Sequence, residues 1–164
     1  MESRWEDQIP HDAPSGGQTL AQMQESLTEI PGLTITTPGG GTPNVKGNTG
    51  YDFTVEVQPG HAIVDGPALV DFLVRSAWSV RDGWMPNAQI SISVQAEPGS
   101  GFDIGPTAAE GGWVAPRDWV VSDSGYSRVP IPVDESKGAE NRERLGPWPG
   151  EVPAVPANVT APAS

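Results

Sequence analysis

The chain has 164 residues, including 20 Gly and 18 Pro, and only 36% of its residues are hydrophobic, which predicts an ordered core smaller than the whole chain. Its net charge of −12 repels phosphate backbones and anionic lipid. Nucleic-acid binding is therefore disfavoured, and without a long apolar run no direct membrane insertion is expected. The lack of Cys excludes disulfides, thiolate metal sites and a cysteine nucleophile.

The first segment, residues 1–17, is polar and shows little periodicity, so we expect a flexible N-terminal lead. Such a lead resembles a polar tether, which slightly favours an extracytoplasmic, cell-envelope location over a cytoplasmic one. Arg outnumbers Lys, and Ala, Gly, Pro, Val and Asp are abundant. This composition is typical of GC-rich coding and indicates a bacterial source.

A helix and a strand are predicted next. Thr19 and Gln22 form a capping-box pattern, apolar residues follow at helical spacing, and Pro31-Gly32 ends the helix. The β-branched run 33–37 predicts a short strand, and residues 38–50 form a long Gly-rich loop. Because another strand follows without an intervening helix, the two strands are predicted to pair as an antiparallel hairpin.

The block from Tyr51 to Ala96 predicts strand, helix and strand. Apolar and polar residues alternate over 51–58 and over 90–96, as in half-buried strands. Between them, Asp65-Gly66-Pro67 is a helix-start pattern, and the helix predicted over 67–81 has a wide apolar arc. This arc predicts a helix that is covered on more than one side.

Beyond Ala96 the periodicity is lost. Pro recurs so closely over 114–164 that we expect an extended, largely disordered tail there. The predicted organisation is thus a lead (1–17), a single α+β domain (18–113) and a Pro-rich tail (114–164).

The predicted fold class is α+β: a small two-layer sandwich of order α-β-β-α-β, with a three-stranded sheet and two helices on one face. This order over residues 18–96 resembles that of the small envelope-associated BON-type domains. The resemblance is topological, and the Gly-bracketed strand motif of those domains is not recognisable between Tyr51 and Gly60, so it implies no functional residue in this chain.

One face of the predicted sheet is left without helices. The candidate partner-contact surface consists of this face and two Trp of the tail. Those two Trp are harder to bury than Trp78, Trp84 and Trp113. The predicted residues of this surface are Asp52, Thr54, Glu56, Ser91, Ser93, Trp119 and Trp148.

No catalytic, cofactor-binding or metal-binding residues are predicted. His11 and His61 lack metal-ligand spacing, and the Ser-Gly strings lie in Gly-rich loops rather than in a strand-turn-helix context. Asp52 and Glu56 on one strand are about 13 Å apart, too far for a glycosidase pair.

The preferred hypothesis is a non-catalytic interaction or accessory domain that binds a protein partner or self-associates. One form of this hypothesis is the soluble part of a bacterial cell-envelope protein or lipoprotein. An alternative is a small-molecule or cation-binding protein that uses the open sheet face and the 38–50 loop. A small hydrolase with an unrecognised site is the third hypothesis.

Overall fold

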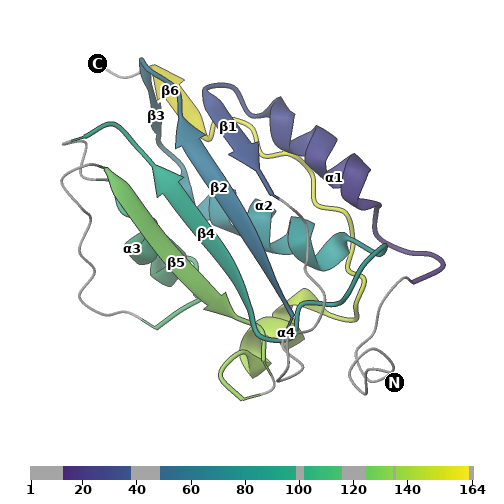
Figure 1. Cartoon of the computed structure of the whole chain (residues 1–164). Helices are drawn as coiled ribbons and strands as arrows, with labels where there is room; N and C mark the ends of the chain where they lie inside the picture. The colour runs from purple at the N-terminus through teal and green to yellow at the C-terminus, as the bar shows by residue number, and fades with distance from the viewer. Residues whose placement is uncertain (1–12, 38–48, 99–101, 116–124, 135, 163–164) are drawn as a thin grey trace, which may run out of the picture.

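The fold is mixed α and β, with a four-stranded sheet whose strand order is β1-β2-β4-β5. The computed structural model describes residues 13–37, 49–98, 102–115, 125–134 and 136–162. The sheet strands are β1 (Leu33–Thr36), β2 (Gly50–Val57), β4 (Gln89–Gln95) and β5 (Tyr126–Pro132). The long helix α2 (Gly66–Ser79) and the short helix α3 (Ile104–Glu110) lie behind this sheet, and its other face carries no described helix (Figure 1).

Strand β2 follows directly from its alternating sequence. Tyr51, Phe53 and Val55 are buried, whereas Asp52 and Thr54 between them are exposed. β4 also places Ile90, Ile92 and Val94 in the core, although Ser91 between them is buried as well. Alternation along each strand therefore gives the sheet one core face and one polar face.

Helix α2 covers nearly the predicted range of 67–81, starting one residue earlier and ending two residues sooner. The Asp65 side chain accepts a hydrogen bond from the Ala68 amide at 3.2 Å, and Pro67 occupies the first turn, where no amide partner is required. Ten of the helix residues are buried, including Leu69, Leu73 and Trp78. The wide apolar arc is thus covered by the sheet and by other segments.

The N-terminal helix also has the predicted start. The Thr19 hydroxyl accepts from the Gln22 amide, and the Gln22 side chain accepts from the Thr19 amide, which completes the capping box. α1 (Leu20–Ser26) passes into a 3₁₀ turn, η1 (Leu27–Glu29), before the chain enters β1. The helix is shorter than predicted because its last turn tightens.

The strand pairings agree with the prediction where it specified them. β1 and β2 are antiparallel, with Leu33 opposite Val57 and Ile35 opposite Val55. β2 and β4 are parallel, with Phe53 opposite Ile92, and α2 connects them. The strand-helix-strand block is therefore a parallel crossover unit.

The sheet has four strands, so the prediction of a three-stranded sheet is wrong. β5 pairs antiparallel with β4, and Val129 and Ile131 enter the core. Pro130 and Pro132 alternate with these two residues along β5. At the proline positions the backbone groups of this edge strand point away from β4, so no amide hydrogen is needed for the pairing. Proline is tolerated there because β5 is an edge strand.

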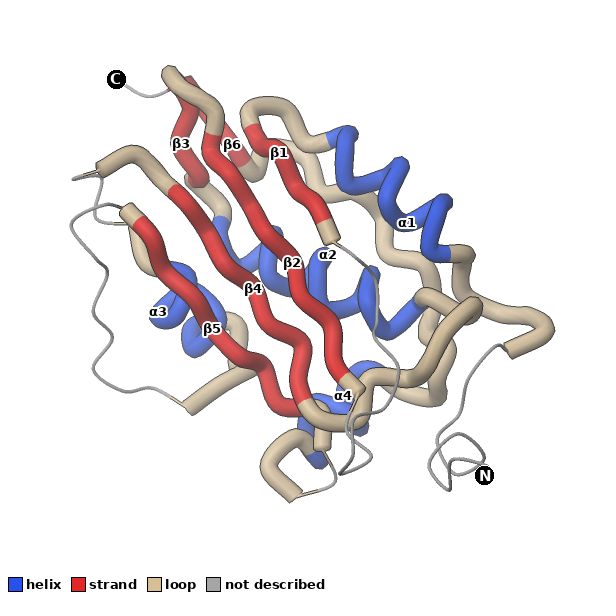
Figure 2. The backbone as a smooth tube through the Cα atoms, viewed as in Figure 1, coloured by secondary structure: helices blue, strands red, loops and turns tan. Residues whose placement is uncertain are grey.

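The predicted disordered tail is also incorrect for the described elements after residue 125. α4 (Ala139–Leu145) follows β5, and β6 (Thr160–Pro162) pairs antiparallel with β3 (His61–Ile63) in a separate two-stranded sheet (Figure 2). Leu145 and Val159 belong to the same hydrophobic core as Phe53 and Ile92. The Pro-rich segment folds because it supplies apolar side chains to that core at intervals.

The predicted α-β-β-α-β order is consequently incomplete. The structure adds β3 before α2, and adds α3, β5, α4 and β6 after β4. Asp103 caps α3, its side chain accepting from the Gly105 amide at 2.9 Å, and the helix buries Ile104 and Ala108. Among the described residues, no helix is both long and apolar enough to cross a membrane.

Candidate functional site

The uncovered face of the four-stranded sheet brings together most of the predicted partner-contact residues. Asp52 lies opposite Ser91, and Thr54 lies opposite Ser93, in the parallel register of β2 and β4. Glu56 extends the row toward the end of β2, where it is exposed. Five residues that are separate in sequence therefore share one polar surface, which we call the open face.

Strand β5 adds residues to the open face that the sequence analysis did not include. Arg128 lies opposite Ser93, and Tyr126 lies opposite Gln95. The Tyr126 hydroxyl donates to Ser93 Oγ at 3.3 Å. The signal was the spacing of Val129 and Ile131 two residues apart, after polar Arg128, which Pro130 and Pro132 obscured.

Ser91 is on the open face but is not accessible. Arg128 Nη2 donates to Ser91 Oγ at 3.0 Å, and Gln89 Nε2 donates to the same oxygen at 3.1 Å. These two longer side chains cover the serine, which is only 1% exposed. A partner at this position would meet Arg128 rather than Ser91.

The charges on the open face are separated and largely solvated. Arg128 Nη2 lies 4.0 Å from Asp52 Oδ1, and the two side chains are 43% and 70% exposed. Such an exposed, long ion pair contributes little to stability. Asp52, Arg128 and the neighbouring Glu56 are therefore available to external groups at small cost.

The two tail Trp do not join the open face as a described site. Trp119 lies outside the described residues. Trp148 is half-buried and packs against the core, and its buried Nε1 has no hydrogen-bond partner among the described residues. The structure thus gives Trp148 a packing role, and its role in partner contact stays a prediction.

The 38–50 loop is described only at its end. Residues 38–48 lie outside the described part of the chain. Thr49 is buried, and its hydroxyl donates to the Met85 carbonyl at 2.6 Å. Asn87 Oδ1 accepts from the Thr49 amide at 2.7 Å, which fixes the entry into β2.

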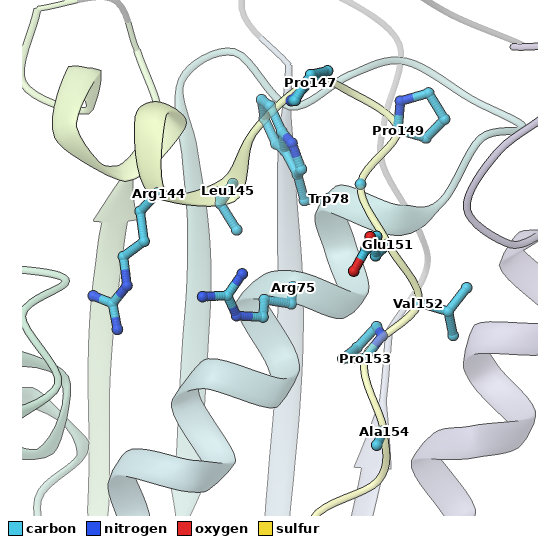
Figure 3. Close-up of a pocket in the computed structure, with 11 residues that line it drawn as sticks. Arg75, Trp78, Arg144, Leu145, Pro147, Pro149, Glu151, Val152, Pro153 and Ala154 are labelled. Atoms are coloured by element: carbon cyan, nitrogen blue, oxygen red, sulfur yellow. The ribbon is translucent and has the colours of Figure 1, made fainter.

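A pocket that the sequence analysis did not predict lies on the helical side of the molecule. Its volume is about 650 Å³, and it lies between α2, α4 and the extended chain at 147–154 (Figure 3). Arg75 and Trp78 come from α2, and Arg144 comes from α4. The Asp71 and Arg75 spacing was visible in the sequence, but Arg144 lies in the segment predicted to be disordered.

The two sites offer different functional groups. The open face supplies hydroxyls, carboxylates and one guanidinium on a sheet surface, and the pocket supplies two guanidiniums, one carboxylate and an indole. His61 lies on β3, where its Nδ1 is 3.2 Å from the Pro59 carbonyl. Within the described ranges, no three His, Asp or Glu side chains are placed to hold a metal ion.

Comparison with other proteins does not assign this fold to a family. No protein-family model, curated protein or solved structure matches the chain. The function must therefore be argued from the two surfaces themselves.

Proposed function

We propose that the protein is a non-catalytic interaction domain that binds a partner protein through the open face. The observation that carries this proposal is the asymmetry of the sheet. Its core face is covered by α2 and α3, while Asp52, Thr54 and Glu56 project from the other face without a described element over them. The envelope location expected from the sequence remains part of this proposal.

The face is a better docking surface than the β5 edge. Pro130 and Pro132 occupy two of the positions whose backbone points away from β4, so the edge cannot donate a regular ladder of hydrogen bonds to an added strand. Tyr126 and Arg128 retain outward amides, but two donors make a short ladder. Face-on docking is therefore favoured over strand addition at this edge.

The charge of the open face indicates a basic partner surface. Asp52 and Glu56 are exposed carboxylates on one strand, and the whole chain carries a net charge of −12. Complementary charge accelerates association and excludes acidic partners. We therefore propose a partner that presents Lys or Arg side chains to β2, with an acidic or hydrogen-bonding group near Arg128.

Site-specific photocrosslinking in the organism that makes the protein tests this proposal. A benzophenone amino acid replaces Thr54 on the open face, and a matched variant carries it at Thr28, which is exposed on η1. We expect a discrete adduct from position 54 that mass spectrometry identifies as one partner, with none of the same mass from position 28. Equal adducts from both positions, or none from position 54, would contradict the proposal.

Charge reversal sharpens the same experiment. D52K combined with E56K should abolish the position-54 adduct, because the basic partner surface would then meet a basic face. E25K combined with E29K makes the same change in net charge on α1 and η1, and should leave the adduct unchanged. An adduct composed of two copies of this chain would indicate self-association instead and would contradict a basic partner.

No observation in the described residues favours the alternatives of cation binding or hydrolysis at the open face.

A further inference from the structure

We infer that the pocket between α2, α4 and residues 147–154 binds a small zwitterion of dipeptide size, with its carboxylate on Arg75 and its ammonium on Glu151. The inference is independent of the partner proposed for the open face, because the two sites lie on opposite sides of the sheet. The pocket contains two arginines, Arg144 and Arg75, whose side chains are held to different extents.

Arg144 is held on three sides. Its Nη1 donates to the Gly111 carbonyl at 2.8 Å, and its Nη2 lies 3.9 Å from Asp71 Oδ1. Its guanidinium carbon lies 3.9 Å from the centroid of the Trp113 ring, a cation–π geometry. Arg144 therefore contributes a fixed positive charge to one side of the pocket.

Arg75 has donors left over. Its Nε donates to both carboxylate oxygens of Asp71, at 3.0 and 3.1 Å, and its side chain is 34% exposed. Neither Nη nitrogen makes a hydrogen bond to a described residue. The pair of Nη groups is the part of a guanidinium that binds a carboxylate through two parallel hydrogen bonds.

Glu151 places a negative charge on another wall. Figure 3 shows the guanidiniums of Arg75 and Arg144 on one side of the pocket and the Glu151 carboxylate on the extended segment across from them. Within the described residues, Glu151 forms no ion pair or side-chain hydrogen bond. A ligand with a carboxylate at one end and an ammonium at the other matches both charges and adds no net charge to the pocket.

The wall between these charges contains Trp78, Pro147 and Pro149 and is held in place by hydrogen bonds. Trp78 Nε1 donates to the Gly146 carbonyl at 3.0 Å, and the Gly150 amide donates to the Trp78 carbonyl at 2.9 Å. A Cβ on Gly150 would lie 2.8 Å from Trp78 Cδ1, so only glycine lets the segment approach the indole this closely. Pro147 and Pro149 complete a surface suited to an apolar side chain.

The volume sets the size of the ligand. Small-molecule pockets usually occupy about 300 to 1,000 Å³. At about 650 Å³ this pocket has room for more than a single amino acid. A dipeptide also carries its ammonium and its carboxylate at opposite ends, which suits a pocket whose opposite charges lie on two different walls.

Isothermal titration calorimetry with the dipeptide Ala-Phe tests the inference on the native protein. N-acetyl-Ala-Phe, which lacks the ammonium, and Ala-Phe amide, which lacks the carboxylate, are the matched ligands. We expect saturable binding of Ala-Phe and binding of each blocked ligand that is weaker by roughly tenfold or more, since each loses a hydrogen bond to a charged group. Absence of binding, or equal affinity for the blocked ligands, would overturn the inference.

Two variants assign the ends of the ligand. In R75Q the amide should bind as well as free Ala-Phe, because the carboxylate contact is already lost. In E151Q the acetylated ligand should bind as well as free Ala-Phe for the corresponding reason. R128Q, an arginine change on the open face, should leave all three affinities unchanged.

Testing each variant with all three ligands distinguishes a lost contact from misfolding, because a misfolded protein would lose its affinity for all three. If R75Q and E151Q both keep the ligand preference of the native protein, the assignment of the two ends is wrong.

Discussion

Two regions of this molecule are held together by different kinds of interaction. The block 50–95 is held by apolar side chains: Phe53, Val55, Ile92 and Val94 are each buried. The region 126–162 also supplies apolar residues, but polar contacts to backbone carbonyls fix its course. Asn141 donates to two carbonyls, Arg142 Nε donates to the Val133 carbonyl, and Thr160 donates to the Pro31 carbonyl.

This difference predicts how each region responds to change. Apolar burial is non-directional, so a core tolerates substitutions that keep volume. A hydrogen bond to a buried carbonyl depends on one donor at one place, and its loss leaves the acceptor unsatisfied. The first region should therefore be sensitive to volume, and the second to the identity of single polar residues.

The largest expected effect is in the first region. Phe53→Ala should lower the free energy of unfolding by about 3–5 kcal/mol, because it removes a large, fully buried side chain and leaves a cavity. Urea unfolding measures the loss. Thr54→Ala, one residue along β2 on the open face, is the control and should change stability by less than about 1 kcal/mol.

A Phe53→Ala protein as stable as the native one would remove the distinction between the regions.

The first region could be predicted from sequence because its signals are local. The alternation at Tyr51, Phe53 and Val55 and the Asp65 cap each report on neighbours within a few residues, and the structure confirms both strands and the helix between them. The pairing of β2 with β4 follows once the crossover is recognised. The open face was predictable for the same reason, since it is formed by the polar residues that alternate with the buried ones.

The second-largest expected effect on stability is in the region 126–162. Asn141 is 5% exposed, and its Nδ2 donates to the Pro132 carbonyl at 2.7 Å and to the Trp113 carbonyl at 3.0 Å. Asn141→Ala should lower the free energy of unfolding by about 1–3 kcal/mol, because both acceptors lose their donor. Glu140→Ala, an exposed neighbour on α4, should have little effect.

Hydrogen exchange resolves where the stability is lost. In Asn141→Ala, amides of β5 and α4 should exchange faster than in the native protein, with a smaller change in β2 and β4. A uniform change over all four elements would show that the two regions unfold as one unit, and the comparison would fail.

The second region could not be predicted because its determinants are not local. Asn141 contacts Trp113, which is 28 residues away in sequence, and Trp78 reaches Gly146 over 68 residues. Pro130 and Pro132 argue against a strand unless the strand is known to be an edge. The pocket was missed for the same reason, since it requires Arg144 to meet α2.

The smallest effect depends on pH. The Ser136 hydroxyl, which donates to Asp134 Oδ2 at 2.8 Å, holds the pKa of Asp134 below its ordinary value, with help from the backbone amides of Lys137 and Gly138. A lowered carboxyl pKa stabilises the fold above the unfolded-state pKa of about 4, and this stabilisation is lost as pH falls through the folded-state value.

Ser136→Ala should therefore raise the pKa of Asp134, as NMR titration measures, and destabilise the protein by less than about 1 kcal/mol at pH 7, since the group is exposed. The part of this difference that comes from Asp134 ionisation should vanish at a pH low enough to protonate Asp134 in both proteins. In an Asp134→Asn background, Ser136→Ala should show no such pH dependence. A difference that persists in that background would assign it to another group.

The pairing of β3 with β6 has a consequence for the timing of folding. His61 lies opposite Pro162, so a ribosome must add about 100 residues after β3 before that strand finds its partner. Contacts between residues so far apart in sequence form late and slowly. Until residues 160–162 are added, β3 lacks its partner strand, and this pairing is expected to be among the last contacts of the fold to form.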